Sequence, residues 1–491
     1  MDDVLAFGGT IAVACAVLLV AVLSNRISDR IGVPAPAIFL VCAAAASDLV
    51  PRLVPPSITD VQRIVTVALV VILFNGGMGI GWERFRENAR GIIWVGVAGT
   101  LVTALAVAAV AHYAFGFDGR LALLLGTALS PTDPAVVFSV LGRREIAGRS
   151  GTLLEGESGA NDPVGIALMV ALISSGGASG LGAVPSVLGE FALQMGVGAA
   201  VGWAGGQVLL LAMRRLALPS EGLYPLRVLA GAGLIYGVAT LAHGSGFLAV
   251  FVAGILVGDE RAPYKREIER FHSALASLAE IVTFTVLGLT VTLRSLPEGR
   301  AWLTGLVIAV LLAFVIRPVL VGLVLWPVRL RRGERLFVLW AGLKGAVPVL
   351  LGTYILTSAE DHRLEAYDVV FVVVLFSVAV QGGLVPLVAS RLKLPVRVVS
   401  QEPWSIGVRF QDEPEGLHRW TVRRGARADG AAVEELPLGE GAWISLVGRA
   451  GRLVQVRGET RLRAGDEVIV LAHDEDAGAA EALFTHRVPR P

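Results

Sequence analysis

Three carboxylates, an amide and a hydroxyl lie close together in the short stretch GTLLEGESGANDP, directly before an apolar run: Glu155, Glu157, Asp162, Asn161 and Ser158. Helical spacing places Ser158 and Asp162 on one face of a helix, with Glu155 one turn before Ser158. A charged side chain at the centre of a bilayer costs about 2.5–3.5 kcal/mol even on the scale derived from membrane insertion. We therefore expect polar partners for this stretch, and its oxygen atoms predict a cation site.

Asp162 is expected near the middle of the membrane. The nearest basic loop covers residues 143–149. At a rise of about 1.5 Å per residue, a helix that starts there is about halfway across the bilayer when it reaches Asp162. A polar loop in front of an ordinary span is the alternative interpretation, and the depth of Asp162 argues against it.

The composition is typical of a polytopic membrane protein. The 491 residues are 54% hydrophobic and 17% charged, whereas soluble domains hold about 25% charged residues. The net charge of +1 gives no reason to expect a nucleic-acid partner. Cys15 and Cys42 both lie in apolar runs, so neither a disulfide framework nor a metal cluster is expected, and we predict no cofactor.

Apolar runs of spanning length recur about thirteen times along the first four fifths of the chain. Arg and Lys are roughly three times as frequent in alternate loops, which places those loops in the cytoplasm. The N-terminus is then outside the cell membrane and the C-terminus inside. The first run follows Asp2 and Asp3 rather than basic residues, so we expect a retained span and not a cleaved signal peptide.

Helix-breaking polar sequences interrupt two of the predicted spans. SPTDP occupies residues 130–134 of the fifth span, and GLKGAVP occupies residues 342–348 of the twelfth. Each frees backbone groups that must face a cavity or other protein. Because the offset between the two spans is odd, they cross the membrane in opposite directions, as inverted repeats require. We predict two crossed discontinuous helices at a transport site, with two ordinary proline kinks as the alternative.

The composition changes after about residue 401, where five strand-like runs alternate with turn residues and precede a helix-like segment: 404–409, 420–424, 443–447, 453–456, 467–471 and the helix 475–484. We therefore expect an all-α transmembrane domain over residues 1–395. A small cytoplasmic α+β domain is expected to follow over residues 402–491.

SPTDP, ESGANDP at 157–163, HGSGFLAV at 243–250 and GLKGAVP together resemble the monovalent cation:proton antiporters. The NhaP-type, cell-volume-regulation K⁺(Na⁺)/H⁺ branch is the most similar, and the resemblance covers the chain up to about residue 395. It implies exchange of K⁺ and/or Na⁺ for protons across the plasma membrane, for pH, cation and volume homeostasis. It also implies a homodimer that moves a core bundle against a fixed interface.

The resemblance places the family's cation site on three side chains, one backbone carbonyl and a nearby carboxylate: Asp162, Ser158, Asp133, Thr132 and Glu157. Asp162 is then expected to carry either a proton or a cation, never both. Asn161 stands where electrogenic relatives carry a second Asp. That difference implies electroneutral, one-for-one exchange.

Three positions bear on the balance of charge inside the membrane. Asn75 stands where the family usually has an acidic residue, and Lys344 stands where many members have Arg. Arg317, next to Pro318, matches a basic family position. We expect Arg317 and Lys344 to compensate buried carboxylates and helix-end carbonyls, because an unpaired charge there is costly.

RLRAGDEVIVL at residues 461–471 resembles the Gly-Asp turn of the TrkA-C domain, the C-terminal lobe of regulators of K⁺ conductance. No Gly-x-Gly-x-x-Gly follows a strand in this part of the sequence, so the nucleotide-binding lobe is not expected. We predict that the domain dimerises and binds a small anionic or nucleotide-like regulator, with Arg449, Arg452 and Arg457 as candidate contacts. A stabilising domain without a ligand is the alternative.

Two other activities fit part of the sequence. A rhomboid-like intramembrane serine protease would pair Ser158 with His243, a dyad adequate for acyl transfer, but it leaves Asp133 and Asp162 unexplained. A cation channel regulated by a TrkA-type domain would need a selectivity filter, and no filter-like repeat is visible. A transporter rather than an enzyme is therefore expected, and dependence on a pH gradient distinguishes an antiporter from a channel.

Overall fold

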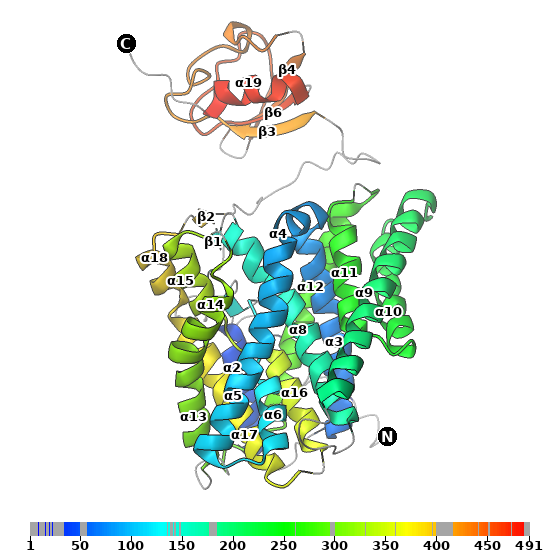
Figure 1. Ribbon diagram of the computed structural model, residues 1–491. Helices are drawn as coiled ribbons and strands as arrows, with labels where there is room; N and C mark the ends of the chain where they lie inside the picture. Colours follow the sequence, from blue (N-terminus) through cyan, green and yellow to red (C-terminus); the bar gives the residue numbers. More distant parts are fainter. Residues whose placement is uncertain are drawn as a thin grey trace. The chain divides into compact units, whose positions relative to one another are not determined.

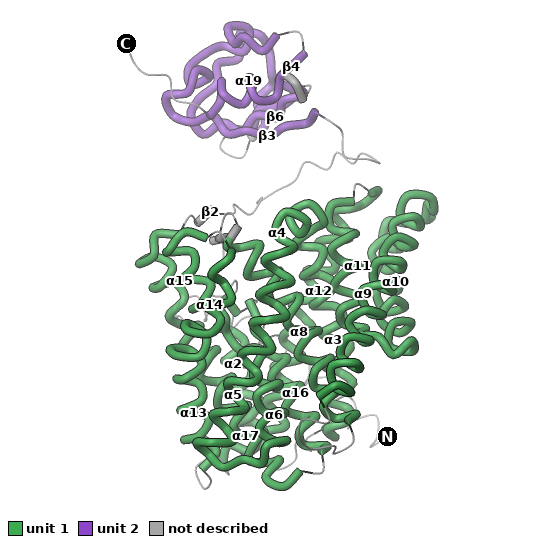
Figure 2. Tube along the Cα trace, viewed as in Figure 1, with its two compact units in different colours: residues 1–405 green, residues 406–491 purple. Residues whose placement is uncertain are grey.

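The computed structural model divides the chain into two compact units, residues 1–405 and 406–491 (Figure 2). It describes residues 8, 15, 19, 22, 34–49, 56–134, 136, 137, 141, 144–146, 149–175, 184–260, 262–294, 300–328, 330–358, 360–394, 396–398, 416–439, 441–449, 452–472 and 474–485. Most of the predicted first span and all of the predicted strand at 404–409 lie outside these ranges.

The first unit is a bundle of helices (Figure 1). Its first half contains α2 (Ala35–Leu49), α3 (Ile58–Ile80), α4 (Trp82–Trp94), the π-helical η1 (Val95–Gly99), α5 (Thr100–Phe115), α6 (Gly119–Ala128), α8 (Arg149–Ser174) and α9 (Val184–Arg215). Its second half contains α10 (Leu223–Leu241), α11 (Gly246–Gly258), α12 (Lys265–Gly288), α13 (Ala301–Leu311), η4 (Leu312–Val321), α14 (Gly322–Val324), α15 (Arg332–Trp340), α16 (Ala346–Leu356), α17 (Arg363–Phe376), η5 (Ser377–Gly382) and α18 (Val385–Arg391). Two short strands, β1 (Arg144–Ile146) and β2 (Val396–Val398), pair antiparallel.

Seven helices within the described part of the chain are long and apolar enough to cross a membrane. Four further apolar helices are shorter, and two of these, α6 and α16, are halves of the spans that the sequence predicts to be interrupted. The predicted class, a polytopic helical membrane protein, is confirmed. The helix α8 lies within the bundle and packs against elements of both halves of the sequence (Figure 1). Its residues Glu157, Ser158, Asn161 and Asp162 are buried.

The second unit is a small sheet covered by one helix. Its strands β3 (Leu417–Thr421), β4 (Ala442–Arg449), β5 (Arg452–Val454) and β6 (Glu467–Ala472) form an antiparallel sheet in the order β3-β6-β4-β5. A short 3₁₀ turn, η6 (Val433–Glu435), precedes β4, and the helix α19 (Asp474–Thr485) closes the unit. Phe484 of α19 is fully buried against the strands. The Gly-Asp turn has the expected geometry, since Gly465 adopts a φ of 91°, which favours glycine.

Two predicted strands and the predicted helix of this unit match observed elements, whereas the run predicted at 453–456 only overlaps β5, which spans Arg452–Val454. The runs predicted at 443–447 and 467–471 lie inside β4 and β6, and the predicted helix at 475–484 lies inside α19. The strand predicted at 420–424 is displaced, because β3 spans Leu417–Thr421. Its alternating exposure follows the period of a strand with one covered face. Leu417 and Arg419 therefore belong to the strand although the predicted run begins later.

Candidate cation site

The first break lies where α6 ends, at Ala128. Pro131 and Pro134 cannot donate a backbone hydrogen bond, which disfavours a helix here, and the chain is not helical between them. The Ser130 hydroxyl donates to the Thr127 carbonyl at 2.8 Å, which satisfies one of the carbonyls that the end of the helix exposes. Residues 131–133 therefore form a non-helical segment in the middle of the predicted fifth span.

The second break separates α15, which ends at Trp340, from α16, which begins at Ala346. Two glycines in it allow other groups to approach the backbone closely. A Cβ atom on Gly342 would overlap the Arg317 guanidinium, and a Cβ atom on Gly345 would overlap the Asp133 carboxylate. Glycine is therefore needed at both positions, because it lets the Arg317 guanidinium and the Asp133 carboxylate lie directly against the backbone of this segment.

The two breaks cross each other, as the sequence predicts. The Asp133 amide donates to the Leu343 carbonyl at 2.8 Å. The Lys344 ammonium donates to the Ser130 and Pro131 carbonyls at 3.0 Å each. Since these carbonyls lie at the end of α6, the lysine occupies the position where a cation balances a helix C-terminus. Lys344 thus joins the two broken helices and is itself buried.

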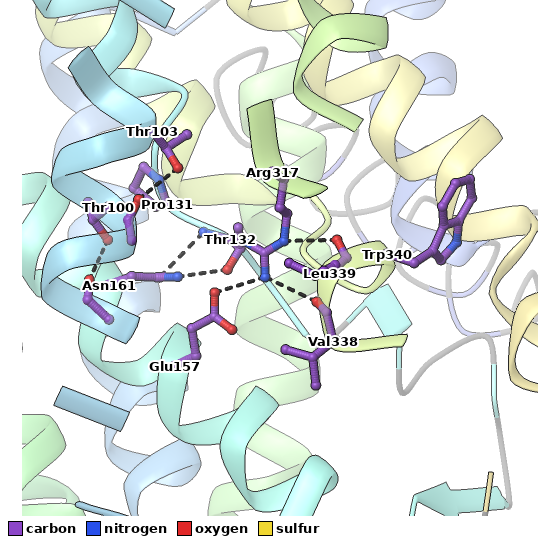
Figure 3. A network of polar contacts seen from close by, with 12 residues as sticks. Thr100, Thr103, Pro131, Thr132, Glu157, Asn161, Arg317, Val338, Leu339 and Trp340 are labelled. Atoms are coloured by element: carbon purple, nitrogen blue, oxygen red, sulfur yellow. Dashed lines mark hydrogen bonds and ion pairs between the residues drawn. The ribbon is translucent and has the colours of Figure 1, made fainter. Parts of the chain in front are cut away.

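Asn161 of α8 holds the first break in place (Figure 3). Its side-chain amide donates to the Thr132 hydroxyl at 2.7 Å, and its carbonyl oxygen accepts from the Thr132 backbone amide at 3.3 Å. Both groups of the Asn161 side chain are therefore used within the protein, and only 2% of the residue is exposed. This arrangement makes Asn161 a positioning residue for Thr132.

Glu157 and Arg317 form a buried ion pair (Figure 3). One guanidinium nitrogen of Arg317 lies 2.8 Å from Glu157 Oε1 and 3.2 Å from the Val338 carbonyl, and its Nε lies 3.0 Å from the Leu339 carbonyl. The pair joins α8 to η4 and to the end of α15. Arg317 therefore contacts both the Glu157 carboxylate and the carbonyls at the end of a broken helix.

Asp162 is placed differently from Glu157. The residue is 7% exposed and, unlike Glu157, forms no ion pair in the part of the chain that the structure describes. Its Oδ1, like Glu157 Oε2, has no hydrogen-bond partner there. Ser158, one turn earlier on α8, is also buried. Pro163 in the next position lacks the amide that would bond to the Gly159 carbonyl, so a backbone oxygen is freed on the same helix. Asp133 and Lys344 interact electrostatically with Asp162.

Asn161 and Thr132 are thus in contact at the first break, and Asp133 and Lys344 each bond across to the other break. Asp162 and Ser158 lie on the same helix as Asn161. The structure also adds polar residues from η5 that the sequence analysis does not single out. The Ser377 hydroxyl accepts from the Lys344 amide at 2.8 Å, and the Gln381 side chain donates to the Trp340 carbonyl at 2.6 Å. Thr103, Arg317 and Lys344 line a pocket together with these two residues. The sequence contains a pattern that could have indicated Ser377 and Gln381: two polar residues four positions apart inside an apolar run.

The remaining candidates lie elsewhere. Asn75 is half-buried on α3. In the second unit, the Arg449 guanidinium is 2.7 Å from the Asp466 carboxylate and also donates to the Arg461 carbonyl. Arg457 is exposed and donates to Gln455. The side chain of Arg452 lies outside the described part of the structure.

A serine protease dyad is not formed. Ser158 is buried in the middle of α8, whereas His243 is exposed just beyond the end of α10, with a φ of 59°. No hydrogen bond joins the two side chains within the described residues. The geometry leaves Ser158 beside Asp162 rather than beside a general base.

Buried acids at two crossed broken helices define a secondary transporter. Residues 15–391 match the model of the sodium/hydrogen exchanger transmembrane family, and residues 417–485 match that of the TrkA-C domain. The chain belongs to the sodium/hydrogen exchanger family and is therefore a cation:proton antiporter, not an enzyme.

Similar proteins agree with this assignment. The K⁺/H⁺ antiporter NhaP of Alkalimonas amylolytica is 36% identical over 79% of this chain and 67% of its own length. The K⁺/H⁺ antiporter NhaP2 of Shewanella sp. strain ANA-3 is 30% identical over 96% of this chain and 83% of its own. The structure of the sodium proton antiporter MjNhaP1 from Methanocaldococcus jannaschii superposes with a TM-score of 0.67 at 21% identity, over 79% of this chain and 99% of that one. That likeness concerns the fold.

Proposed function

We propose that the chain exchanges K⁺, or Na⁺ in its place, for protons at a site formed around Asp162. The observation that carries the proposal is the buried Asp162 carboxylate, one oxygen of which has no hydrogen-bond partner in the described structure. A bare carboxylate in such surroundings is costly, so a proton or a cation completes it. The relatives whose names specify K⁺/H⁺ exchange favour K⁺ over Na⁺.

Exchange then follows from competition for one carboxylate. A cation at Asp162 is coordinated by oxygens, which the Ser158 hydroxyl, the Asp133 carboxylate and the Thr132 carbonyl supply around the crossing. A proton on Asp162 removes the negative charge that attracts the cation. The core bundle carries the site from one side of the membrane to the other with one occupant at a time.

The neighbouring charges keep this competition local. Glu157 and Arg317 neutralise each other, and Lys344 is bound to backbone carbonyls. Asn161 is uncharged and hydrogen-bonded to Thr132, so it adds no second titrating group beside Asp162. One proton for one cation, and hence electroneutral exchange, is the stoichiometry that this arrangement favours.

The chain is assigned to the cell membrane, with its N-terminus outside and its C-terminal unit in the cytoplasm, on the basis of the Arg and Lys bias of alternate loops. A homodimer is proposed because the resemblance to NhaP-type antiporters implies one. Both assignments are tested by cysteine accessibility in intact cells and by the mass of the purified protein in detergent.

The C-terminal unit is proposed to bind a small anionic or nucleotide-like regulator. Because Arg449 is engaged by Asp466, exposed Arg457 is the better candidate contact among the described arginines. A regulator acts only as far as it distinguishes two transporter states. Removal of residues 402–491 should leave exchange intact but alter its pH dependence or maximal rate. An unchanged profile, with and without cytosolic extract, would contradict the regulatory role.

The central experiment uses purified full-length protein in proteoliposomes that contain a pH-sensitive dye. K⁺, Na⁺ or choline is added outside across a range of pH, with and without an imposed membrane potential. Proton movement with K⁺, weaker movement with Na⁺ and none with choline are expected. A potential of 100 mV acts on one transferred charge with about 2.3 kcal/mol, so a clear voltage response would contradict electroneutral exchange. Cation flux without proton movement would instead indicate a channel.

A further inference from the structure

The aromatic ring of Phe251, on α11, lies directly against the backbone of α8 at Gly159. A Cβ atom on Gly159 would overlap the ring, so only glycine allows the ring to come this close. Gly159 follows Ser158 and stands three positions before Asp162, which places it on an adjoining part of the same helix face. The ring therefore meets α8 about one helical turn from the Asp162 carboxylate.

The ring lies on one particular side of Asp162. The helix α8 begins at Arg149, at the end of the basic loop 143–149, and Gly159 comes before Asp162 on it. Phe251 therefore contacts α8 between this loop and Asp162. The loop is one of those that the bias of Arg and Lys assigns to the cytoplasm. A path from the cation site to the cytoplasm along this face of α8 is thus obstructed at Phe251.

Two further apolar side chains extend the obstruction towards the basic loops. Ile255 lies one turn beyond Phe251 on α11, which ends at Gly258, and Ile80 is the last residue of α3. The three side chains are at most 2% exposed and form one apolar cluster, against which Phe85 of α4 packs. A cation among such groups would lose its water shell without any replacement, so the cluster excludes cations.

The backbone that carries Phe251 is fixed to two neighbouring helices. α11 packs against both α3 and α9 (Figure 1). A Cβ atom on Gly77 of α3 would lie 2.5 Å from the Phe251 carbonyl oxygen, and one on Gly202 of α9 would lie 2.5 Å from the Ala249 carbonyl oxygen. These distances leave no room for a side chain, so the helices meet backbone to backbone. α3, α9 and α11 therefore form one block.

The helix α8, in contrast, is tied to the broken helices. Asn161 is hydrogen-bonded to Thr132 at the first break, and Glu157 is paired with Arg317 of η4. At Gly159 the contact with α11 is a ring on a backbone that carries no side chain, and such a surface can shift without interlocking. Phe251 therefore lies at a boundary between the block that it belongs to and the part of the bundle that holds the cation site.

We propose that Phe251 closes the cation site from the cytoplasm, and that Gly159 lets α8 move past the ring as the site changes sides. Alternating access requires that the site open to one side at a time. The ring and the two isoleucines supply the barrier, and the missing side chain at position 159 supplies the clearance. This inference rests on the proposed exchange function and adds to it a residue that keeps the exchange coupled.

The first test adds a methyl group at the contact and then makes room for it. Gly159→Ala should lower the maximal rate of K⁺-driven proton movement about tenfold, because overpacking at a moving contact raises the barrier to the change of side. The half-saturating K⁺ concentration should change by less than about twofold, since Ser158 and Asp162 keep their ligand atoms. The double variant Gly159→Ala/Phe251→Leu should recover most of the rate, because leucine is shorter and remains apolar.

Gly231→Ala is the matched control for this crowding. Its Cβ atom would lie 2.8 Å from Leu209 Cδ1, at a contact between α10 and α9 away from Phe251, and its rate should stay within about twofold of the wild type. Thermal unfolding in detergent shows whether each variant is folded. A wild-type rate for Gly159→Ala, or a loss that Phe251→Leu does not relieve, would overturn the proposal.

The second test removes the ring and measures leakage. In proteoliposomes with a K⁺ gradient and a potential-sensitive dye, one-for-one exchange creates no membrane potential. Phe251→Ala should let K⁺ pass without a proton, so that a potential develops, whereas Phe251→Leu should behave as the wild type. Choline in place of K⁺ gives the background.

This second measurement decides alone if Gly159→Ala cannot be recovered folded. A Phe251→Ala protein that exchanges at the wild-type rate and produces no potential would overturn the proposed closure. A wild type that moves no protons against K⁺ would instead refute the proposed function, whereas a K⁺ potential confined to Phe251→Ala would still support the role of the ring as a barrier.

Discussion

Glu157 and Asp162 lie little more than one helical turn apart on α8, and both are buried, but their carboxylates are treated in opposite ways. Glu157 is neutralised by Arg317, which also caps the end of α15. Each carboxylate has one oxygen without a hydrogen-bond partner in the described structure, Glu157 Oε2 and Asp162 Oδ1, but Asp162 forms no ion pair among the described residues. The difference separates a carboxylate that holds the bundle together from one that is left to an exchangeable occupant. Burial alone does not distinguish the two roles. The difference is that the partner of Glu157 is a side chain of the protein, whereas the proposed partner of Asp162 is an ion that comes and goes.

The largest effect is expected from Asp162→Asn. The amide can neither release a proton nor attract a cation with a full charge, so cation-driven proton movement should fall to the level of empty liposomes. Folding should be retained, since no hydrogen bond to Oδ1 is lost. Dye-loaded proteoliposomes measure the exchange, and thermal unfolding in detergent measures the fold. Glu190→Gln is the control, because Glu190 is a carboxylate of the spanning helix α9 that accepts a hydrogen bond from Gln194. Near-normal exchange by Asp162→Asn would remove the central proposal.

Glu157→Leu should have the opposite profile, with its main effect on stability. Removal of one partner of a buried ion pair typically costs about 3–5 kcal/mol, because the remaining charge is left uncompensated. Thermal unfolding in detergent should therefore begin at a clearly lower temperature. The double variant Glu157→Leu/Arg317→Met should recover part of the loss. If the single variant is as stable as the wild type, the pair is not the structural element that the comparison requires.

Much of this contrast is beyond prediction from one sequence. The two breaks, the acids of α8 and the strands of the C-terminal unit follow from local patterns, because helix periodicity, prolines and turn residues act over a few positions. The residues that pair with these groups cannot be predicted from local patterns. Arg317 is 160 positions from Glu157, and Lys344 is 214 positions from Ser130. Whether Arg317 or Lys344 balances a given carboxylate depends on how distant helices pack.

Asn161 illustrates the same limit, since its motif is easily found but its role depends on contacts. The motif indicates a place beside the cation, and the hydrogen bonds to Thr132 assign it to the support of that place.

The pair Arg449–Asp466 extends the comparison to an ion pair outside the membrane. Burial alone would raise the pKa of Asp466, but hydrogen bonds from Arg449 and from the Arg463 amide outweigh it and hold the pKa below its ordinary value. The stabilisation is therefore complete above about pH 4 and is lost as the pH falls through the folded-state pKa. Asp466→Asn should cost about 1–3 kcal/mol at pH 7.

The measurement for Asp466 is urea unfolding of the C-terminal unit, which has its own core, followed by tryptophan fluorescence. The difference between wild type and Asp466→Asn should shrink as the pH falls below about 4. Asp429→Asn is a suitable control, because Asp429 accepts backbone hydrogen bonds from Gly425 and Ala464 without a cationic partner among the described residues. A difference that stays constant between pH 7 and pH 2 would show that the charge of Asp466 is not what stabilises the turn.

The smallest effect is expected from Ser158→Ala. This variant tests how much a neutral ligand contributes on the helix face that Ser158 shares with the charged Asp162. The change removes one neutral oxygen and leaves the exchanging carboxylate in place, so the half-saturating cation concentration should rise by about threefold to tenfold with little change in maximal rate. Ser150→Ala is the control on the same helix, because the Ser150 hydroxyl is buried and makes no hydrogen bond in the described structure. Exchange is measured in dye-loaded proteoliposomes over a series of K⁺ concentrations. A complete loss of turnover with unchanged cation affinity would mean that Ser158 does chemistry of its own, whereas a graded change confined to affinity is what a single neutral ligand beside Asp162 can produce.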